Sequence, residues 1–108
     1  MKLTDLEPQF IKSHSDHHTR VDKIAEADGI MFLCPVCFLK NGNSPVGTHV
    51  IICWQPHVPQ TIFPKPGRWK FIGTSFSDLS LRAGSSSISL TGGCNAHFYI
   101  RNGIIEIA

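Results

Sequence analysis

Two short motifs, Cys34-Pro35-Val36-Cys37 and Cys94-Asn95-Ala96-His97, are separated by 56 residues of sequence. Each motif presents two potential metal ligands with two residues between them, a spacing that lets one tight turn direct both side chains at a single ion. Cysteine thiolates and histidine nitrogens are the usual ligands of tetrahedral zinc in proteins. The two motifs therefore predict one zinc ion bound by Cys34, Cys37, Cys94 and His97.

The predicted site is structural rather than catalytic. A zinc ion with four protein ligands has no open position for a water molecule or a substrate, and its binding energy becomes part of the folding energy. Pro35 would stiffen the first motif, and Gly92-Gly93 would supply the positive φ values that a tight turn before Cys94 needs. We therefore expect loss of the ion to loosen the whole domain.

Two further residues bear on the ligand set. His49, Ile51 and Cys53 share one face of a predicted strand. Cys53 could replace His97 and give an all-cysteine site, but we favour its interpretation as a small buried hydrophobic residue. His49 is interpreted as a hydrogen-bonded strand residue rather than as a ligand.

The composition is that of one small globular domain. The chain has 108 residues, of which 42% are hydrophobic and only 17% are charged, and so few charges argue against disorder. Seven prolines and nine glycines lie between short apolar runs, which predicts many turns and many short strands. We therefore predict a mainly β fold, a small zinc-stapled antiparallel sheet or sandwich with a C-terminal hairpin and one or two short N-terminal helical turns.

The sequence also limits the expected location. No apolar run reaches the roughly 20 residues that a membrane-spanning helix needs, and we expect no membrane association. Residues 1–8 carry early acidic side chains and no apolar h-region, so secretion through a signal peptide is not expected. The expected compartment is the cytoplasm, where four cysteines are interpreted as metal ligands or free thiols before disulfides.

The chain divides into an N-terminal arm, residues 1–20, which we expect to be partly flexible, and a zinc-binding β domain, residues 21–108. A capping-box pattern at 4–7 and the apolar spacing over 21–27 each predict a short helical turn. Residues 55–67 contain four prolines and are predicted to be a stiff connection without a central strand. The predicted strands before the last hairpin cover residues 30–33, 48–54, 68–72, 79–82 and 87–90, with a turn at Gly84-Ser85-Ser86.

The C-terminal segment predicts a β-hairpin with a defined register. Asn102-Gly103 lies between two alternating apolar runs and suits a type I′ turn, which needs positive φ at both positions. A two-residue loop pairs Arg101 with Ile104 and sets the pairs that follow. The resulting apolar face consists of Phe98, Ile100, Ile105 and Ile107, whereas His97 belongs to the opposite face.

Catalytic motifs are absent from the sequence. It contains no H-E-x-x-H, no G-x-S-x-G, no His-x-Glu of a zinc deaminase and no glycine-rich phosphate loop. His14, His17 and His18 could bind a second metal if they lay on one helix face, but the favoured interpretation is an exposed polar segment. A zinc-dependent hydrolase or nucleic-acid enzyme is therefore the least favoured of the functions considered, and a non-enzymatic role is expected.

A binding surface is the more natural use of the remaining features. Large aromatic side chains close to arginine can anchor a protein partner or stack on bases, although tryptophans in so small a domain are often core residues. The low net charge of +2 favours a protein partner over nucleic acid, and a homo-oligomer would use the same surface. The candidate surface residues are Trp54, Arg68, Trp69, Tyr99 and Arg101.

Four segments resemble a family of small uncharacterised proteins encoded by tailed phages and prophages. They are residues 32–37, Gly47-Thr48-His49, residues 66–69 and residues 90–103, and the resemblance spans roughly residues 21–107. Some members carry the label "ammonia monooxygenase", which no motif in this sequence supports. The resemblance implies a metal-binding β domain in a bacterial host or a phage particle. The expected function is an accessory factor that binds a phage or host protein, with a capsid- or tail-associated virion component as the alternative.

Overall fold

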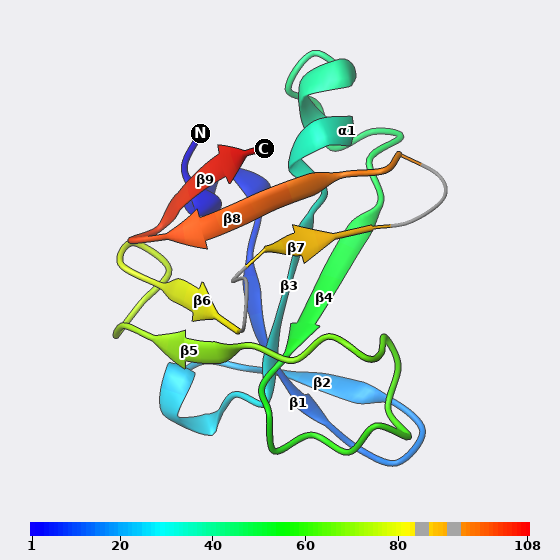
Figure 1. Cartoon of the computed structure of the whole chain (residues 1–108), viewed down its shortest axis with the longest axis vertical. Helices are drawn as coiled ribbons and strands as arrows, with labels where there is room; N and C mark the ends of the chain where they lie inside the picture. The colour runs from blue at the N-terminus through cyan, green and yellow to red at the C-terminus, as the bar shows by residue number, and fades with distance from the viewer. Residues whose placement is uncertain (84–86, 91–93) are drawn as a thin grey trace.

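The computed structural model describes residues 1–83, 87–90 and 94–108. Within these ranges the fold is mainly β, with three antiparallel sheets and a single α-helix (Figure 1). This agrees with the fold class predicted from the sequence. The strands are β1 (Gln9–Ser13), β2 (His18–Val21), β3 (Gly29–Leu33), β4 (Val50–Trp54), β5 (Lys70–Ile72), β6 (Ser80–Arg82), β7 (Ile88–Ser89), β8 (His97–Arg101) and β9 (Ile104–Ile107).

The largest sheet has the strand order β2-β1-β3-β4. Its central strand, β3, is the apolar run that the sequence analysis predicted, and its residues Ile30 and Phe32 are almost fully buried. Strand β4 pairs with β3 over its whole length, from Gly29 opposite Trp54 to Leu33 opposite Val50. Helix α1 (Pro35–Lys40) follows β3 directly, where the Cys34-to-Cys37 spacing predicted only a tight turn.

The hairpin over residues 9–21 is part of this sheet, whereas we expected residues 1–20 to form a separate arm. Strands β1 and β2 form a hairpin, and β1 also pairs with β3, so that Phe10 lies opposite Ile30. Phe10 and Ile11 are buried. The polar run that suggested an arm supplies the loop of this hairpin and the exposed edge strand β2, which gives it little apolar periodicity.

Two short 3-10 helices lie in the N-terminal region, where two short helical turns were predicted, although their bounds differ from the predicted ones. The first covers Leu3–Leu6 and the second covers Ile24–Glu26. The chain before Leu3 runs beside β9, where the Ile105 N–H donates to the Met1 carbonyl at 2.8 Å. Leu3 and Leu6 are fully buried, so this turn belongs to the core.

The C-terminal hairpin has the predicted register. Arg101 pairs with Ile104, and the pairing continues to Phe98 opposite Ile107. The turn residues Asn102 and Gly103 have φ values of 50° and 72°, as the Asn-Gly sequence requires. Phe98, Ile100 and Ile105 are buried, but Ile107, the last residue of the predicted apolar face, is 47% exposed.

The two remaining pairings place β6 and β7 in different sheets. Strand β6 pairs with β5, whereas β7 pairs with β8, giving the third sheet the order β7-β8-β9. The turn predicted at residues 84–86 lies outside the described residues, as do the two glycines at 92 and 93. The connection over residues 55–67 contains no strand, as predicted, and it includes cis peptide bonds before Pro64 and Pro66.

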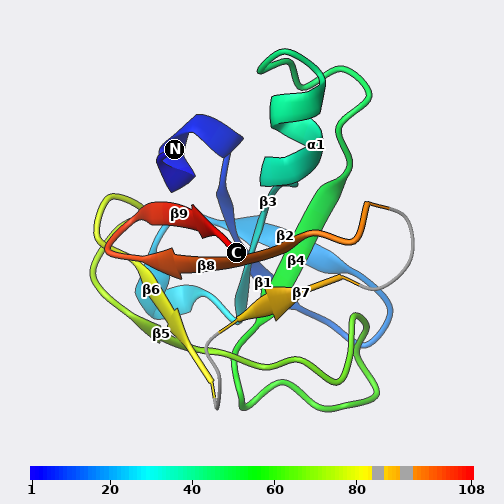
Figure 2. The same ribbon diagram turned by 45° about the horizontal axis from the view of Figure 1, so that its top comes forward.

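One main hydrophobic core joins the sheets. The rings of Phe32, from β3, and Phe98, from β8, meet edge to face with centroids 6.0 Å apart. A smaller cluster of Ile11, Trp54 and Val58 lies under the proline-rich connection. In both views of the ribbon, β7 and β8 lie close to β4, and the N-terminal end of β4 lies close to the segment that enters β8 (Figures 1 and 2).

Candidate metal centre

Cys34 and Cys37 are positioned by the junction of β3 and α1. Cys34 is the N-cap residue of α1 and Pro35 occupies its first turn, a position that proline favours. The Phe38 N–H donates to the Cys34 carbonyl at 2.9 Å, which closes the first helical turn. Residues three apart on a helix lie on the same side, so both thiols point to one place.

His49 is brought to the same place by the pairing of β3 with β4. The ladder between these strands extends one step beyond β4, since the Cys34 N–H donates to the His49 carbonyl at 2.9 Å. His49 therefore lies beside Cys34 at the end of the sheet. Its side chain is exposed, and its Nε2 lies 3.3 Å from the Sγ of Cys94.

Cys94 reaches the cluster from the third sheet, where it precedes β8. Its Sγ lies 3.7 Å from the Sγ of Cys34. Asn95, which follows Cys94, adopts a left-handed conformation with φ of 51° and turns the chain toward β8. The donor atoms of Cys34, Cys37, His49 and Cys94 all lie within 4.8 Å of one another, so these four residues could hold one metal ion.

The thiols of the cluster differ in acidity because their surroundings differ. Burial raises the pKa of Cys34 to about 11, and its hydrogen bonds with the other two thiols add to this effect. Burial also raises the pKa of Cys94, but hydrogen bonds from His49, the Ala96 backbone and the other thiols outweigh it and hold the pKa at about 7. Because metals bind the thiolate form, Cys94 is better prepared than Cys34 to bind a metal at neutral pH.

The cluster takes its histidine from position 49, not from position 97 as we expected. His97 opens β8, is exposed, and lies near Tyr99 with ring centroids 5.9 Å apart. Phe98 is fully buried, and neighbouring side chains on a strand point to opposite faces, so His97 faces away from the core. The spacing of Cys94 and His97 therefore does not bring His97 into the cluster.

A signal for His49 was present in the sequence. One apolar run ends just before Cys34 and another begins just after His49, and in the structure these runs form an antiparallel pair with Leu33 opposite Val50. In such a pair, the residue that follows one strand lies opposite the residue that precedes the other. Recognising this pair would have placed His49 next to Cys34.

Cys53 is a core residue, as the favoured interpretation predicted. Its side chain is 0% exposed, and burial raises the pKa of its thiol. It is not a member of the four-residue cluster. An all-cysteine site using Cys53 in place of His97 is therefore not what the structure assembles.

The histidines at 14, 17 and 18 do not form a second ligand group among the described residues. The rings of His14 and His17 stack with centroids 4.6 Å apart in the loop of the first hairpin. His17 Nδ1 lies 2.6 Å from an Asp16 oxygen, and His14 Nε2 lies 3.0 Å from Thr19 Oγ1. Their surroundings are those of the exposed polar segment that the sequence analysis favoured.

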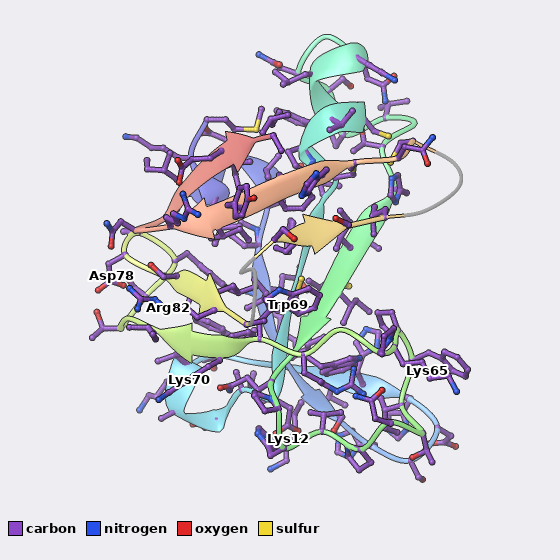
Figure 3. The ribbon with its side chains drawn as sticks, in the orientation of Figure 1. Lys12, Lys65, Trp69, Lys70, Asp78 and Arg82 are labelled. Carbon is purple, nitrogen blue, oxygen red and sulfur yellow. The ribbon has the colours of Figure 1, made fainter. Side chains whose placement is uncertain are left out.

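The five residues of the predicted binding surface do not lie on one surface. Trp54 is only 2% exposed, and its indole N–H donates to the Phe63 carbonyl at 2.8 Å. Arg68 uses its guanidinium to hold backbone carbonyls of the proline-rich connection. Tyr99 and Arg101 are on β8, where the Arg101 guanidinium lies 4.4 Å from the Tyr99 ring centroid. Trp69 remains half-buried between β4 and β7 (Figure 3).

Comparison with known proteins gives no match for this chain. No protein-family model matches the sequence, and neither a curated protein nor a solved structure shows significant similarity to it. Among the described residues, no helix has the length and the apolar character that crossing a bilayer requires. The metal centre is therefore the feature from which a function has to be argued.

Proposed function

We propose that the protein is a zinc-stabilised binding module without catalytic activity of its own. The convergence of three thiols and one imidazole from three separate parts of the chain is the observation that carries this proposal. Residues of these types are the ligands that zinc prefers, and a set of three cysteines and one histidine is common in structural zinc sites.

The separations of the donor atoms fit a tetrahedral zinc ion. Zinc–sulfur bonds of about 2.3 Å place two sulfur ligands of a tetrahedron about 3.8 Å apart, and a zinc–nitrogen bond of about 2.0–2.1 Å shortens the mixed edge slightly. The sulfur atoms of Cys34 and Cys94 are 3.7 Å apart, and His49 Nε2 is 3.3 Å from the Sγ of Cys94. All four donor atoms lie within 4.8 Å of one another, so binding zinc would draw the more widely separated donors closer together.

The position of the ligands supports a structural role for the ion. Cys34 and Cys37 follow β3 and His49 precedes β4, so three ligands come from one end of the largest sheet. Cys94 comes from the segment before β8, in another sheet. An ion held by all four would tie the two sheets together, and four protein ligands would leave no position for a substrate.

The phage or prophage setting is part of the proposal and comes from the resemblance of residues 21–107. In that setting the module would act as an accessory factor that binds a phage or host protein. Co-purification tests it: recovery of a defined protein from infected cells supports an accessory factor, whereas presence of the chain in purified particles would favour a virion component.

Metal analysis and chelation test the structural role of zinc. We expect one zinc per purified chain, and we expect chelation at neutral pH to remove the ion and the near-ultraviolet circular dichroism together. Zinc added back should restore both. A Cys94→Ala variant that stays folded and stable without metal would overturn the proposal, because the ion would then contribute little to folding.

A further inference from the structure

A groove of about 530 Å³ runs between β4 and β7. One wall is the outer edge of β4, the other is β7, and Trp69 and the cis-proline segment Pro64–Gly67 also line the groove. Strand β4 is the last strand of its sheet and β7 is the last strand of its own, so two sheet edges border the same groove. Figures 1 and 2 show these two strands side by side.

The outward main-chain groups of β4 face this groove. In an antiparallel pair, alternate residues exchange ladder hydrogen bonds with the partner strand. The bonds from Cys34 N–H to the His49 carbonyl and from Gln55 N–H to the Asp28 carbonyl show that the odd-numbered residues of this stretch face β3. The N–H and C=O groups of Val50 and Ile52 therefore point away from β3, and no main-chain hydrogen bond joins them to another described residue.

The opposite wall shows the same alternation. The Leu90 N–H donates to the Ala96 carbonyl at 2.8 Å, which assigns the even-numbered residues of β7 to the ladder with β8. The main-chain groups of Ser89 consequently face away from β8, toward the groove that Ser89 lines.

Trp69 spans the groove at one end. Its backbone N–H donates to the Trp54 carbonyl of β4 at 2.9 Å, and its indole N–H donates to the Ser87 carbonyl beside β7 at 3.2 Å. A single residue thus contacts both walls, so one polypeptide segment reaches both edges at this point. The hydrogen bond from the Trp69 N–H to the Trp54 carbonyl is the one that an additional strand beside β4 would make first. After Trp69 the chain turns away from β4 and makes no further ladder bond to it among the described residues. Figure 3 shows Trp69 between β7 and the lower part of β4.

We propose that an extended segment of a partner protein binds in this groove and pairs with β4 as an additional strand, continuing the ladder that Trp69 begins. This inference rests on the proposed function, since it names the site and the chemistry of the partner. Main-chain hydrogen bonds would give the affinity of such a complex, as in other cases of strand addition.

The groove also sets the side-chain chemistry of the segment. Its walls carry apolar side chains, including Val50, which is 52% exposed, and the half-buried Ile52. Lys65 lines the cis-proline end, and none of the described residues that line the groove is acidic. The segment therefore carries aliphatic side chains next to Val50 and Ile52 and an acidic residue next to Lys65.

Amide hydrogen exchange on the zinc-loaded, full-length chain tests the site. The probe is a synthetic twelve-residue peptide obtained by panning a displayed random library against the protein. We expect this peptide to slow exchange at the Val50 and Ile52 amides at least tenfold. The Ile51 and Cys53 amides should be protected already without it. A selected peptide that leaves exchange at Val50 and Ile52 unchanged overturns the proposal, as does a library that yields no binder.

Matched variants separate the contribution of the Ile52 main-chain N–H to peptide binding from that of the Ile52 side chain. Ile52→Pro removes an N–H that faces the groove and leaves the ladder with β3 intact, since proline is tolerated on edge strands in this orientation. We expect it to weaken peptide binding at least tenfold, and Ile52→Thr, which keeps the N–H, to weaken it less than threefold. If Ile52→Pro does not fold, peptides N-methylated at single positions provide the same test, and unchanged affinity for every methylated peptide overturns the proposal.

Two other outcomes are informative. Protection of Val50 and Ile52 that rises with protein concentration without peptide would mean that a second copy occupies the edge, and this overturns the partner proposal. A failure of the zinc proposal can be told apart from a failure of the groove proposal. If only the zinc proposal fails, the metal-free protein stays folded and the peptide still slows exchange at the Val50 and Ile52 amides.

Discussion

His49 Nε2 lies 3.3 Å from the Sγ of Cys94, a residue 45 positions later in the sequence, in the segment that precedes β8 of another sheet. This contact predicts that His49→Ala weakens zinc binding more than any other histidine substitution. Substitution of a residue that only hydrogen-bonds to a metal ligand lowers metal affinity about 10- to 100-fold. Removal of the ligand itself should lower the zinc affinity by more than this. Competition with a chromophoric chelator at neutral pH measures the affinity.

His97→Ala is the matched control for His49→Ala. His97 is exposed on β8 and does not belong to the cluster, so we expect its substitution to change zinc affinity less than threefold. Cys53→Ala should likewise keep one zinc per chain, although it removes a buried thiol and lowers stability. Loss of zinc in His97→Ala, with retention in His49→Ala, would contradict the ligand set proposed here.

The guanidinium of Arg68 organises the proline-rich connection. It donates to five backbone carbonyls, those of Val58, Pro59, Ile62, Pro64 and Gly67, over distances of 2.7–3.0 Å. Arginine has five N–H donors and lysine has three, so Arg68→Lys must leave carbonyls unpaired. We predict a loss of about 1–3 kcal/mol in the free energy of unfolding, measured by urea denaturation.

Arg101→Lys is the control for the Arg68 prediction. Arg101 is an exposed residue that pairs with Glu106 at 3.3 Å, and exposed ion pairs contribute about 0–1 kcal/mol. We expect this variant to unfold at nearly the wild-type urea concentration. Equal effects of the two substitutions would show that the bonds of Arg68 do not hold the connection in solution.

The elements with strong local signals could be predicted from the sequence. Asn102-Gly103 fixes both the turn and the register of the last hairpin, because few residues accept positive φ at two successive positions. The apolar run ending at Leu33 indicates a buried strand without help from its neighbours. Cys34 and Cys37 were found because their spacing is set by local geometry, whereas Cys94 was found through a spacing to His97 that the cluster does not use.

The remaining features depend on contacts between distant segments. Strand β2 is an exposed edge, so its sequence carries no apolar alternation, and its place in the sheet follows from pairing with β1. The fourth residue of the cluster depends on the register of β3 against β4, which no local pattern around His49 encodes. Arg68 looked like a surface residue because the carbonyls that it holds belong to an irregular loop.

We predict that protonation of the Asp28 carboxylate lowers the stability of the protein at acidic pH. Burial raises the pKa of Asp28, but hydrogen bonds from His57 Nε2 at 2.7 Å and from Ser13 at 2.8 Å outweigh it, and the pKa lies below its ordinary value. The unfolded chain has a pKa of about 3.9 at this residue. The stabilisation is therefore present above that pH and is lost as the pH falls through the lower value of the folded state.

Asp28→Asn should remove this dependence of stability on pH. At pH 7 we expect the variant to be less stable by about 1–3 kcal/mol, the range for hydrogen bonds to a charged group. The difference from wild type should shrink as the pH falls below about 4. Asp22→Asn, which removes an exposed carboxylate, is the control for the change in net charge. A difference that stays constant from pH 7 to pH 3 would rule out the linkage.

Gly29 allows β3 and β4 to pack at the Trp54 position. A Cβ atom at residue 29 would lie 2.6 Å from the Cys53 carbonyl oxygen and 2.6 Å from Cε3 of the Trp54 ring, which lies directly opposite. Since Gly29 is buried, neither neighbour can move without disturbing the core. We predict that Gly29→Ala lowers the free energy of unfolding by about 1–3 kcal/mol, the usual effect of overpacking.

Gly42→Ala separates this steric effect from backbone conformation. Gly42 has a φ of 67°, and an added methyl group there would meet no neighbouring atom within 4 Å, so its substitution costs only the left-handed conformation, about 1–2 kcal/mol. The two sites differ in their dependence on Trp54. In a Trp54→Leu background, Gly29→Ala should lose part of its effect, because the indole half of the clash is gone, whereas Gly42→Ala should keep its full effect. Additive effects at both sites, measured by urea denaturation of the single and double variants, would mean that the Trp54 ring does not press on residue 29.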